Sequence, residues 1–520
     1  MLLTNMIDHT KEHYGEYPFL YHDDKVFTNH DVEKFAKKIS ILLRNQGIAD
    51  GDKVIVSMPN NPEVIFSFQG ILRSRNIVIP VMYLLHPNEI FYILHDSNAK
   101  AIFTTAEFLP KMIEAAKNLT IPMKFIVTDS IEDRSACEGY DIIELYPEIE
   151  KIDVSEEVLK AANDNDLAVI LYTSGTTGRP KGVMLTHKNL SVEPMQSFQT
   201  SLKEGRNERN TTIVVLPLAH IYGFGVMCTS FMLGNSIVVY SKFDLEKVCQ
   251  AIENFKVKWF AVVPAMVHSM AFSPIPDKYD LSSLESVNCG SANLPLMVIE
   301  TFEKRFNADI REAYGLSEAA TGGVAGHWDG VPIKRGSAGI PFPYVEVRIV
   351  DQDGTELPRG EVGEIIVKGD TISPGYYGLP EETAKAIKNG WLYTGDLAMM
   401  DDEDYIFIVD RKKDLIIRGG FNIYPRDLEE IIIKHEAVSD VAVIGVADER
   451  MGEEVVACVV KKPGSEVSEQ DIISYTQKNI AKYKSPRRVI FVESLPRNGV
   501  GKILKRKLRD DFEKIDVSVS

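Results

Sequence analysis

Short apolar runs alternate with amphipathic segments early in the chain, and this alternation most constrains the fold. The apolar run 52–60 is followed by a helix-like segment, 61–74, and by a second apolar run, 76–81; the same order recurs within 99–129. Strands and helices at this spacing favour parallel strands that are joined by helices. We therefore expect an α/β fold with doubly wound sheets in a large N-terminal domain.

The pattern changes twice towards the C-terminus. From about residue 335, strand-like runs follow one another with turn signals at 351–354 and 401–404, which indicates a β-rich part over about 335–410. Beyond it, helix-like and strand-like segments mix over a length that is usual for a domain. We predict one domain over 1–410 and a small α+β domain over 411–520.

Charge and cysteine usage exclude some classes of protein. The net charge of −17 argues against a general nucleic-acid binder. The five cysteines are scattered and form no CxxC pair, which is typical of a reducing compartment and not of a disulfide framework or a zinc site. The first 20 residues lack the pattern of a signal peptide. We expect a cytoplasmic protein.

Residues 211–240 contain no Asp, Glu, Lys or Arg, and an uncharged stretch of this length can mark a membrane span. Pro217 and the glycines that follow it divide the stretch into two strand-like runs and a middle segment. We therefore expect buried core here and no transmembrane span.

The segment 172–183, YTSGTTGRPKGV, concentrates hydroxyls, glycines and a lysine after an apolar run. Small residues let the backbone approach a ligand closely, and hydroxyl and backbone N–H groups suit phosphate oxygens. A plain surface turn contains similar residues. The spacing is not that of a Walker loop, which needs four residues between its glycines and ends in Lys-Ser/Thr. We interpret the segment as a phosphate-binding loop of another kind.

Four later stretches place polar side chains beside apolar runs: 312–320, 391–397, 410–425 and 496–508. The first groups an aromatic ring, a hydroxyl and a carboxylate, and the second sets Asp396 in an expected turn between two strands. Each stretch alone is compatible with an ordinary turn or cap. Their order and their spread along the chain favour one functional site.

Together these stretches resemble the adenylate-forming superfamily of acyl-CoA synthetases, beetle luciferases and adenylation domains of peptide synthetases. The resemblance covers nearly the whole chain and is strongest to bacterial fatty-acid–CoA ligases, through 171–187, 390–398 and 410–430. It implies ATP-dependent activation of a carboxylic acid through an acyl-adenylate, followed by transfer to coenzyme A. Because these steps bring anions together, positioning and charge neutralisation should dominate catalysis.

The resemblance also implies roles for individual side chains. Lys502 would bridge the carboxylate and the α-phosphate, and Thr173 and Glu318 would bind Mg²⁺, which prefers oxygen ligands. The implied catalytic residues are Lys502, Glu318, Lys181 and His220. The implied ATP and AMP ligands are Thr173, Ser174, Gly175, Thr176, Thr177, Gly178, Gly290, Ser291, Ala292, Tyr314, Gly315, Ser317, Asp396 and Arg411.

The C-terminal domain of the family is mobile, and the same is implied here. Its hinge would lie at Asp410 to Lys413. After the hinge turns, Gly419 and Gly420 would border the entry of coenzyme A in place of Lys502. A pivot at a domain edge is physically reasonable.

The acyl pocket would be lined by 220–225, 260–266 and 315–323, none of which contains Lys or Arg. A second carboxylate on the substrate would therefore lack a partner, so we expect an apolar monocarboxylate, a medium or long fatty acid before an aryl acid. Val262 and the Cys289–Ala292 stretch depart from the family pattern and leave chain length open. His220 is either a guard of the carboxylate or a satisfied core histidine.

Other readings stay open. An adenylation enzyme that loads an acyl or aryl acid onto a carrier protein would share every motif. An inactive homologue that only binds nucleotide is disfavoured because Lys181, Glu318, Asp396 and Lys502 are all present, and a luciferase-like oxygenase is less favoured. The oligomeric state also stays open, with a homodimer as one option.

Overall fold

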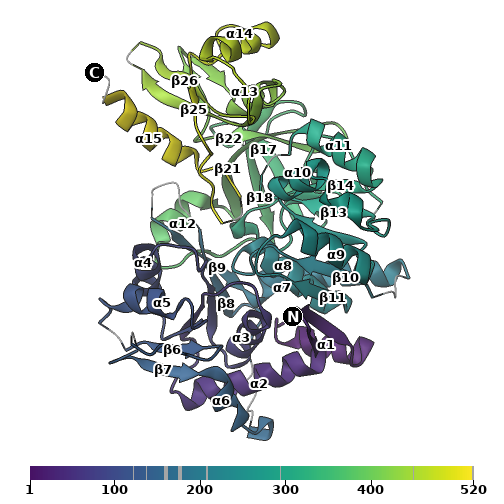
Figure 1. The fold of residues 1–520 in the computed structure, drawn as a ribbon, viewed down its shortest axis with the longest axis vertical. Coiled ribbons are helices and arrows are strands. Elements are labelled where there is room, and N and C mark those ends of the chain that lie inside the picture. The colour runs from purple at the N-terminus through teal and green to yellow at the C-terminus, as the bar shows by residue number, and fades with distance from the viewer. Residues whose placement is uncertain are drawn as a thin grey trace.

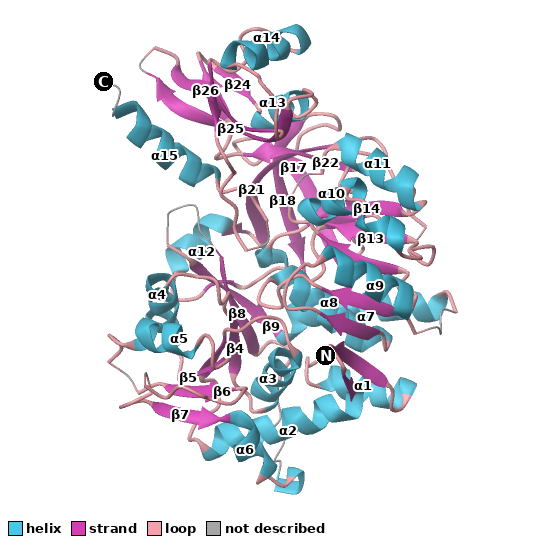
Figure 2. Ribbon diagram, in the orientation of Figure 1, coloured by secondary structure: helices cyan, strands magenta, loops and turns pink. Residues whose placement is uncertain are grey.

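The computed structural model describes residues 1–120, 122–135, 137–156, 162–173, 179–205, 209–292, 294–328, 330–448, 450–499 and 501–517. Figure 1 and Figure 2 show the N-terminal α/β layers in the lower part of the view and the C-terminal elements, from β23 (Ile416–Arg418) onward, at the top. The mixed α/β class expected from the sequence is confirmed.

The largest sheet has eight strands in the order β19-β9-β8-β4-β3-β5-β6-β7. Its strands β4, β3, β5 and β6 run parallel, as the alternation in 52–129 predicted. α3 starts where Asn61 accepts the Val64 N–H and Pro62 takes the first helical position. The strands are β3 (Lys53–Val56), β4 (Ile77–Pro80), β5 (Ala101–Thr104), β6 (Lys124–Val127), β7 (Asp141–Glu144), β8 (Leu167–Thr173), β9 (Lys181–Thr186) and β19 (Gly375–Tyr376). The helices of this part are α3 (Pro62–Arg73), α4 (Pro87–Ser97), α5 (Leu109–Ala116) and α6 (Leu145–Glu150).

Two further sheets have the orders β10-β11-β1-β2 and β12-β13-β14-β15-β16. Their strands are β1 (Pro18–His22), β2 (Lys25–Thr28), β10 (Thr211–Val214), β11 (Ser236–Val239), β12 (Trp259–Val262), β13 (Ser286–Cys289), β14 (Asp309–Tyr314), β15 (Ala325–Gly326) and β16 (Ile340–Pro341). The helices around them are α1 (Asn5–Tyr14), α2 (Asn29–Asn45), α7 (His187–Lys203), α8 (Ile221–Leu233), α9 (Leu245–Phe255), α10 (Pro264–Phe272) and α11 (Leu296–Phe306).

The uncharged stretch 211–240 forms β10, α8 and β11. Most of α8 is buried, so its apolar surface packs against the rest of the protein. In the part of the chain that the structure describes, no helix has the length and apolar character needed to cross a membrane.

The β-rich part is one antiparallel sheet, in the order β17-β18-β21-β20 with β22 beside β21. These strands are β17 (Val345–Val350), β18 (Val362–Gly369), β20 (Ile387–Lys388), β21 (Trp391–Met400) and β22 (Ile406–Arg411), and α12 (Pro380–Ala386) precedes β20. The turn expected at Asp396 is wrong, because β21 continues through this residue. Gly395 has a φ of 73°, and the ladder with β22 is irregular after Leu397, so the strand absorbs the distortion without ending.

The C-terminal elements build a fifth sheet, β24-β23-β26-β25, with β27 beside β26. They are β24 (Phe421–Ile423), α13 (Pro425–Ile432), β25 (Val438–Asp448), β26 (Gly452–Lys461), α14 (Glu469–Asn479), β27 (Arg488–Phe491) and α15 (Lys505–Val517). Their buried side chains form core clusters made only of C-terminal residues. A separate core is what an independent domain needs, but the boundary after residue 410 stays a prediction.

Candidate active site

The loop that carries Lys502 lies against the segments that follow β4 and β12, two strands that belong to different sheets. Lys502 donates its backbone N–H to the Asn498 side chain at 2.9 Å, and its carbonyl accepts the Asn498 N–H at 2.9 Å. Gly499 lies against Met82, just after β4, and a Cβ built on Gly501 would contact Val263, just after β12. Carboxyl ends of parallel strands are where α/β proteins usually bind ligands.

Lys502 is partly buried and lies near other charged side chains. Burial lowers the pKa of its ammonium group to about 8, and the positive charge of Arg411 lowers it further, while Asp396 opposes this shift. The side chain is only half-buried. Lys502 therefore remains mostly protonated at neutral pH and presents its charge inside the protein.

His220 caps α8 and is close enough to Lys502 for the lysine charge to affect its pKa. Its Nδ1 accepts the Tyr222 N–H at 3.2 Å. Burial lowers the pKa of His220 to about 4, and the charge of Lys502 lowers it further. Because Nδ1 accepts, the proton of the neutral ring is assigned to Nε2, which can donate to a carboxylate. His220 is thus both a structural cap and a side chain next to the predicted catalytic lysine.

Asp396 is held by two side chains. The Tyr314 hydroxyl, at the end of β14, donates to Asp396 Oδ2 at 2.7 Å, and Arg411 Nε on the neighbouring strand β22 lies 3.3 Å from Oδ1. Asp396 itself is buried. A fixed carboxylate beside an aromatic ring has the chemistry to accept hydrogen bonds from the hydroxyls of a nucleoside, and this role of Asp396 stays a prediction.

The predicted adenine side lies next to this group. A Cβ on Gly290 would lie 3.3 Å from the Tyr222 ring, and Ser291 has a φ of 72°. Gly315 lies so close to Gly323 that a Cβ built on Gly315 would be 2.9 Å from the Cα of Gly323. Ser317 and Glu318 follow Gly315 in the short turn Ser317–Ala319. Ala292 follows Ser291 in the same loop.

The phosphate side is described only at its edges. Ser174, Gly175, Thr176, Thr177 and Gly178 lie outside the described residues, but Thr173 ends β8 and pairs with Lys181 at the start of β9. Lys181 Nζ forms an ion pair of 2.6 Å with Glu382. The hairpin therefore holds Thr173 and Lys181 at the two ends of the predicted phosphate loop.

Glu318 is tied to the same hairpin by Tyr376, whose hydroxyl donates to Glu318 Oε1 at 2.8 Å. Tyr376 pairs with Val183 of β9, and Lys181 Nζ lies 5.2 Å from the centre of its ring. Within the described chain, no three His, Cys, Asp or Glu side chains gather as a metal site. One carboxylate and nearby hydroxyls fit a Mg²⁺ ion that takes its other oxygens from phosphate.

The Gly419–Gly420 turn is not part of this group. It joins β23 to β24, and both glycines have positive φ, 56° and 82°, as a two-residue type I′ turn requires. Gly419 packs against Met451 of its own domain, and a Cβ on Gly420 would meet nothing within 4 Å. In this arrangement the Lys502 loop lies near the other predicted site residues, and the glycine turn is exposed at the surface of the C-terminal part.

The predicted hinge is bound from both sides. Asp410 accepts the N–H groups of Arg411 and Arg426, at 2.7 and 3.1 Å. Lys412 forms a 3.0 Å ion pair with Glu364 of β18, and Lys413 follows it directly. These bonds connect the end of the β-rich sheet to the start of α13.

Sequence reasoning missed Tyr376 and Glu382. Neither has a local signal, because Glu382 lies in the first turn of α12 and Tyr376 lies in a two-residue strand. The two departures noted in the sequence, Val262 and Cys289, are buried in the core that α9, α10 and α11 form with β12 and β13.

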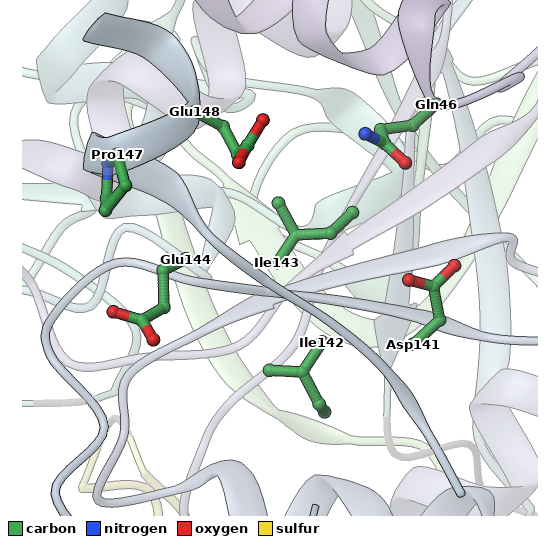
Figure 3. Close-up of a pocket in the computed structure, with 7 residues that line it drawn as sticks. All are labelled: Gln46, Asp141, Ile142, Ile143, Glu144, Pro147 and Glu148. Carbon is green, nitrogen blue, oxygen red and sulfur yellow. The ribbon is translucent and has the colours of Figure 1, made fainter.

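A pocket of about 420 Å³ lies at the edge strand β7, away from these residues (Figure 3). It is at the other edge of the sheet from β19 and is lined by Gln46, residues 141–144, Pro147 and Glu148.

Comparison with known proteins gives consistent matches over the whole chain. A family model described as AMP-binding enzyme matches residues 7–377, and one described as AMP-binding enzyme C-terminal domain matches residues 427–502. A long-chain-fatty-acid–CoA ligase of Bacillus subtilis (strain 168) is 36% identical over 514 residues, which cover 94% of this chain and 90% of that protein. A 4-coumarate:CoA ligase of Petunia hybrida is 36% identical over 502 residues, covering 94% and 89%.

Among solved structures, ATP-bound MatB from Rhodopseudomonas palustris has a TM-score of 0.87 at 26% identity and covers 99% of this chain and 100% of that chain. The apo structure of the same protein, with the same identity and coverage, has a TM-score of 0.75. The arrangement of the whole chain is thus more similar to the ATP-bound structure than to the apo structure.

Proposed function

The chain belongs to the AMP-binding enzyme family, and from this premise we propose that it activates a carboxylic acid with ATP and transfers the acyl group to coenzyme A. In the first step a carboxylate oxygen attacks the α-phosphorus, a new O–P bond forms and pyrophosphate leaves. In the second step the thiol sulfur attacks the acyl carbon, loses its proton, and AMP leaves. The observation that carries the proposal is the position of the Lys502 loop, which lies against Met82 after β4 and Val263 after β12. Lys502 is there close enough to His220, Asp396 and Arg411 for their charges to interact.

The residues of the site suit the first step. Lys502 neutralises charge between the carboxylate and the α-phosphate, and His220 Nε2 orients the carboxylate. Asp396 accepts from the ribose hydroxyls, with Tyr314 and Arg411 holding it in place. Fixed donors and charges of this kind lower the barrier because they need no reorganisation during the reaction.

Mg²⁺ belongs to the same proposal. Glu318 and Thr173 would hold the ion, and Ser317 would contact the α-phosphate. The ion supplies charge neutralisation on the phosphate oxygens. Lys181 contributes a positive charge to the leaving pyrophosphate once it is released from Glu382.

For the substrate we propose a monocarboxylic acid, a medium or long fatty acid before an aryl acid. The similarity to a long-chain-fatty-acid–CoA ligase supports the first, and the equal similarity to a 4-coumarate:CoA ligase supports the second. Loading of a carrier protein remains the alternative. The five cysteines are free thiols, which supports a cytoplasmic location.

The test is an ATP–pyrophosphate exchange assay over fatty and aryl acids of varied length, followed by thioester formation with coenzyme A or a holo-carrier protein. We expect exchange with monocarboxylates above dicarboxylates of equal length, and a thioester with free coenzyme A. If none of the acids supports exchange, acid activation is contradicted. If the thioester forms only on the carrier protein, the alternative function is supported.

A further inference from the structure

Glu193 is a deeply placed carboxylate that the proposed chemistry does not use. It lies on α7, where Ser197 donates to Oε1 at 2.8 Å and Thr229 of α8 donates to Oε2 at 2.7 Å. Burial raises the pKa of Glu193, and the two hydroxyls oppose this shift; none of the groups that set the pKa is a cation. A carboxylate has room for about four hydrogen bonds, so Glu193 can accept more than these two.

One face of α8 connects Glu193 to the nucleotide site. Tyr222, Gly225 and Thr229 are spaced i, i+3 and i+7 and therefore lie on the same face. Tyr222 donates to the Asn288 carbonyl at 2.7 Å, Gly225 lies against Thr321, and Thr229 reaches Glu193. The face begins beside the predicted adenine loop and ends at Glu193.

The side chains at the far end of this face lie close together and keep part of their surface accessible. Glu193, Thr229 and Tyr344 are only half-buried, although burial is the main cause that shifts the pKa of both Glu193 and Tyr344. The Tyr344 hydroxyl donates to the Gly322 carbonyl at 2.9 Å, and a Cβ on Gly322 would lie 2.5 Å from Glu193 Cβ. The accessible surface of these three side chains leaves the Glu193 carboxylate within reach of a ligand.

We propose that Glu193 forms the far end of the acyl site and accepts a hydrogen bond from a hydroxyl or amino group at the distal end of the acid. The inference rests on the proposed function and refines its substrate class. His220 marks the carboxylate end of the site, and Thr229 lies about 13 Å further along the axis of α8. At about 1.1–1.2 Å per bond, an extended chain of about 11 bonds spans this distance. A ten-carbon ω-hydroxy acid has about this number of bonds between its carboxylate oxygen and its terminal oxygen.

The test compares matched acids in the full-length enzyme. Octanoic, nonanoic and decanoic acids are each paired with their ω-hydroxy and ω-amino forms, and kcat/KM is measured by pyrophosphate exchange. We expect the wild type to prefer an ω-hydroxy or ω-amino acid. Glu193→Leu should reduce this preference by about 10- to 100-fold, the effect of one hydrogen bond to a charged group. The ω-hydroxy and ω-amino arms distinguish the two donor groups.

Two controls separate specificity from folding. Gln196→Leu, a similar change on the same helix, should leave the preference unchanged. Glu193→Gln keeps an acceptor oxygen and should retain part of the ω-hydroxy preference. If the wild type prefers the plain acid at every chain length, the role of Glu193 is overturned without any variant. The role is also overturned if Glu193→Leu lowers kcat/KM equally for the plain acid and for its ω-substituted form. If none of the acids supports pyrophosphate exchange, both the proposed function and this inference are contradicted.

Discussion

The Tyr314 hydroxyl donates a 2.7 Å hydrogen bond to Asp396 and so joins two sheets, because Tyr314 ends β14 and Asp396 lies within β21 of the β-rich sheet. Arg411 contacts the other carboxylate oxygen from β22. Asp396 is therefore oriented by protein groups, and in its proposed role as ribose acceptor it would need little rearrangement. Such preorganisation lowers the entropy cost of binding.

Replacing the hydroxyl should weaken nucleotide binding. Tyr314→Phe keeps the ring and removes the donor, so we expect the KM for ATP to rise about 10- to 100-fold, equivalent to roughly 1.5–3 kcal/mol for a hydrogen bond to a charged group. The measurement is pyrophosphate exchange against ATP concentration. Tyr393→Phe, another tyrosine of the β-rich sheet, is the control and should change little. An unchanged KM in Tyr314→Phe would show that Asp396 does not depend on this bond.

Adenylation should depend on pH through Lys502. Its pKa is lowered to about 8, so the ammonium loses its charge as the pH rises through that value. We expect kcat/KM for pyrophosphate exchange to fall above about pH 8, where the free enzyme titrates. Lys502→Arg should be slower but should lose this decline, because a guanidinium stays charged. The same decline in Lys502→Arg would assign the titration to another group.

Glu382 should compete with the nucleotide for Lys181. The two side chains are 2.6 Å apart, and hydrogen bonds from Lys181 and Lys385 lower the pKa of Glu382 to about 2. Glu382→Gln should therefore lower the KM for ATP modestly, and more so at low ionic strength. Glu381→Gln, at the exposed neighbouring position, is the control. A higher KM in Glu382→Gln would mean that Glu382 positions Lys181 productively.

Metal removal should abolish adenylation. We expect excess chelator to stop pyrophosphate exchange and added Mg²⁺ to restore it, and Glu318→Gln should need a higher Mg²⁺ concentration because one anionic oxygen is lost. The measurement is exchange rate against free Mg²⁺. Full turnover in excess chelator would exclude a role for the ion.

The sequence predicted those parts of the fold that depend on local patterns. The parallel strands β3 to β6 follow from apolar runs separated by amphipathic helices, and the resemblance to the adenylate-forming superfamily is confirmed by the family match. The turn expected at Asp396 was wrong because Thr394, Gly395 and Asp396 are typical turn residues. In the structure the residues on either side of them pair with β18, and Asp396 pairs with Arg411 of β22, so β21 continues through an irregular stretch.

Other features depend on contacts between distant segments. Tyr376 and Glu318 are separated by 58 residues, and Lys181 and Glu382 by 201, so no local pattern indicates either pair. In the sequence alone Glu193 looks like an ordinary helical glutamate, because its hydrogen bond with Thr229 depends on the packing of α8 against α7. The predicted roles of the site residues and of the Gly419–Gly420 turn stay predictions that only kinetics can test.

The central claim is that Lys502 acts in adenylation and that the turn at Gly420 acts in thioester formation. The most direct measurement is the rate of both half-reactions in Lys502→Ala, once an unchanged melting transition shows that the variant is folded. We predict that adenylation slows by about 10²- to 10³-fold, roughly 2.7–4 kcal/mol, while preformed acyl-AMP still reacts with coenzyme A at nearly the normal rate. A bulky residue at Gly420 should give the reverse. If Lys502→Ala slows both half-reactions equally, the account is contradicted and Lys502 has a structural role.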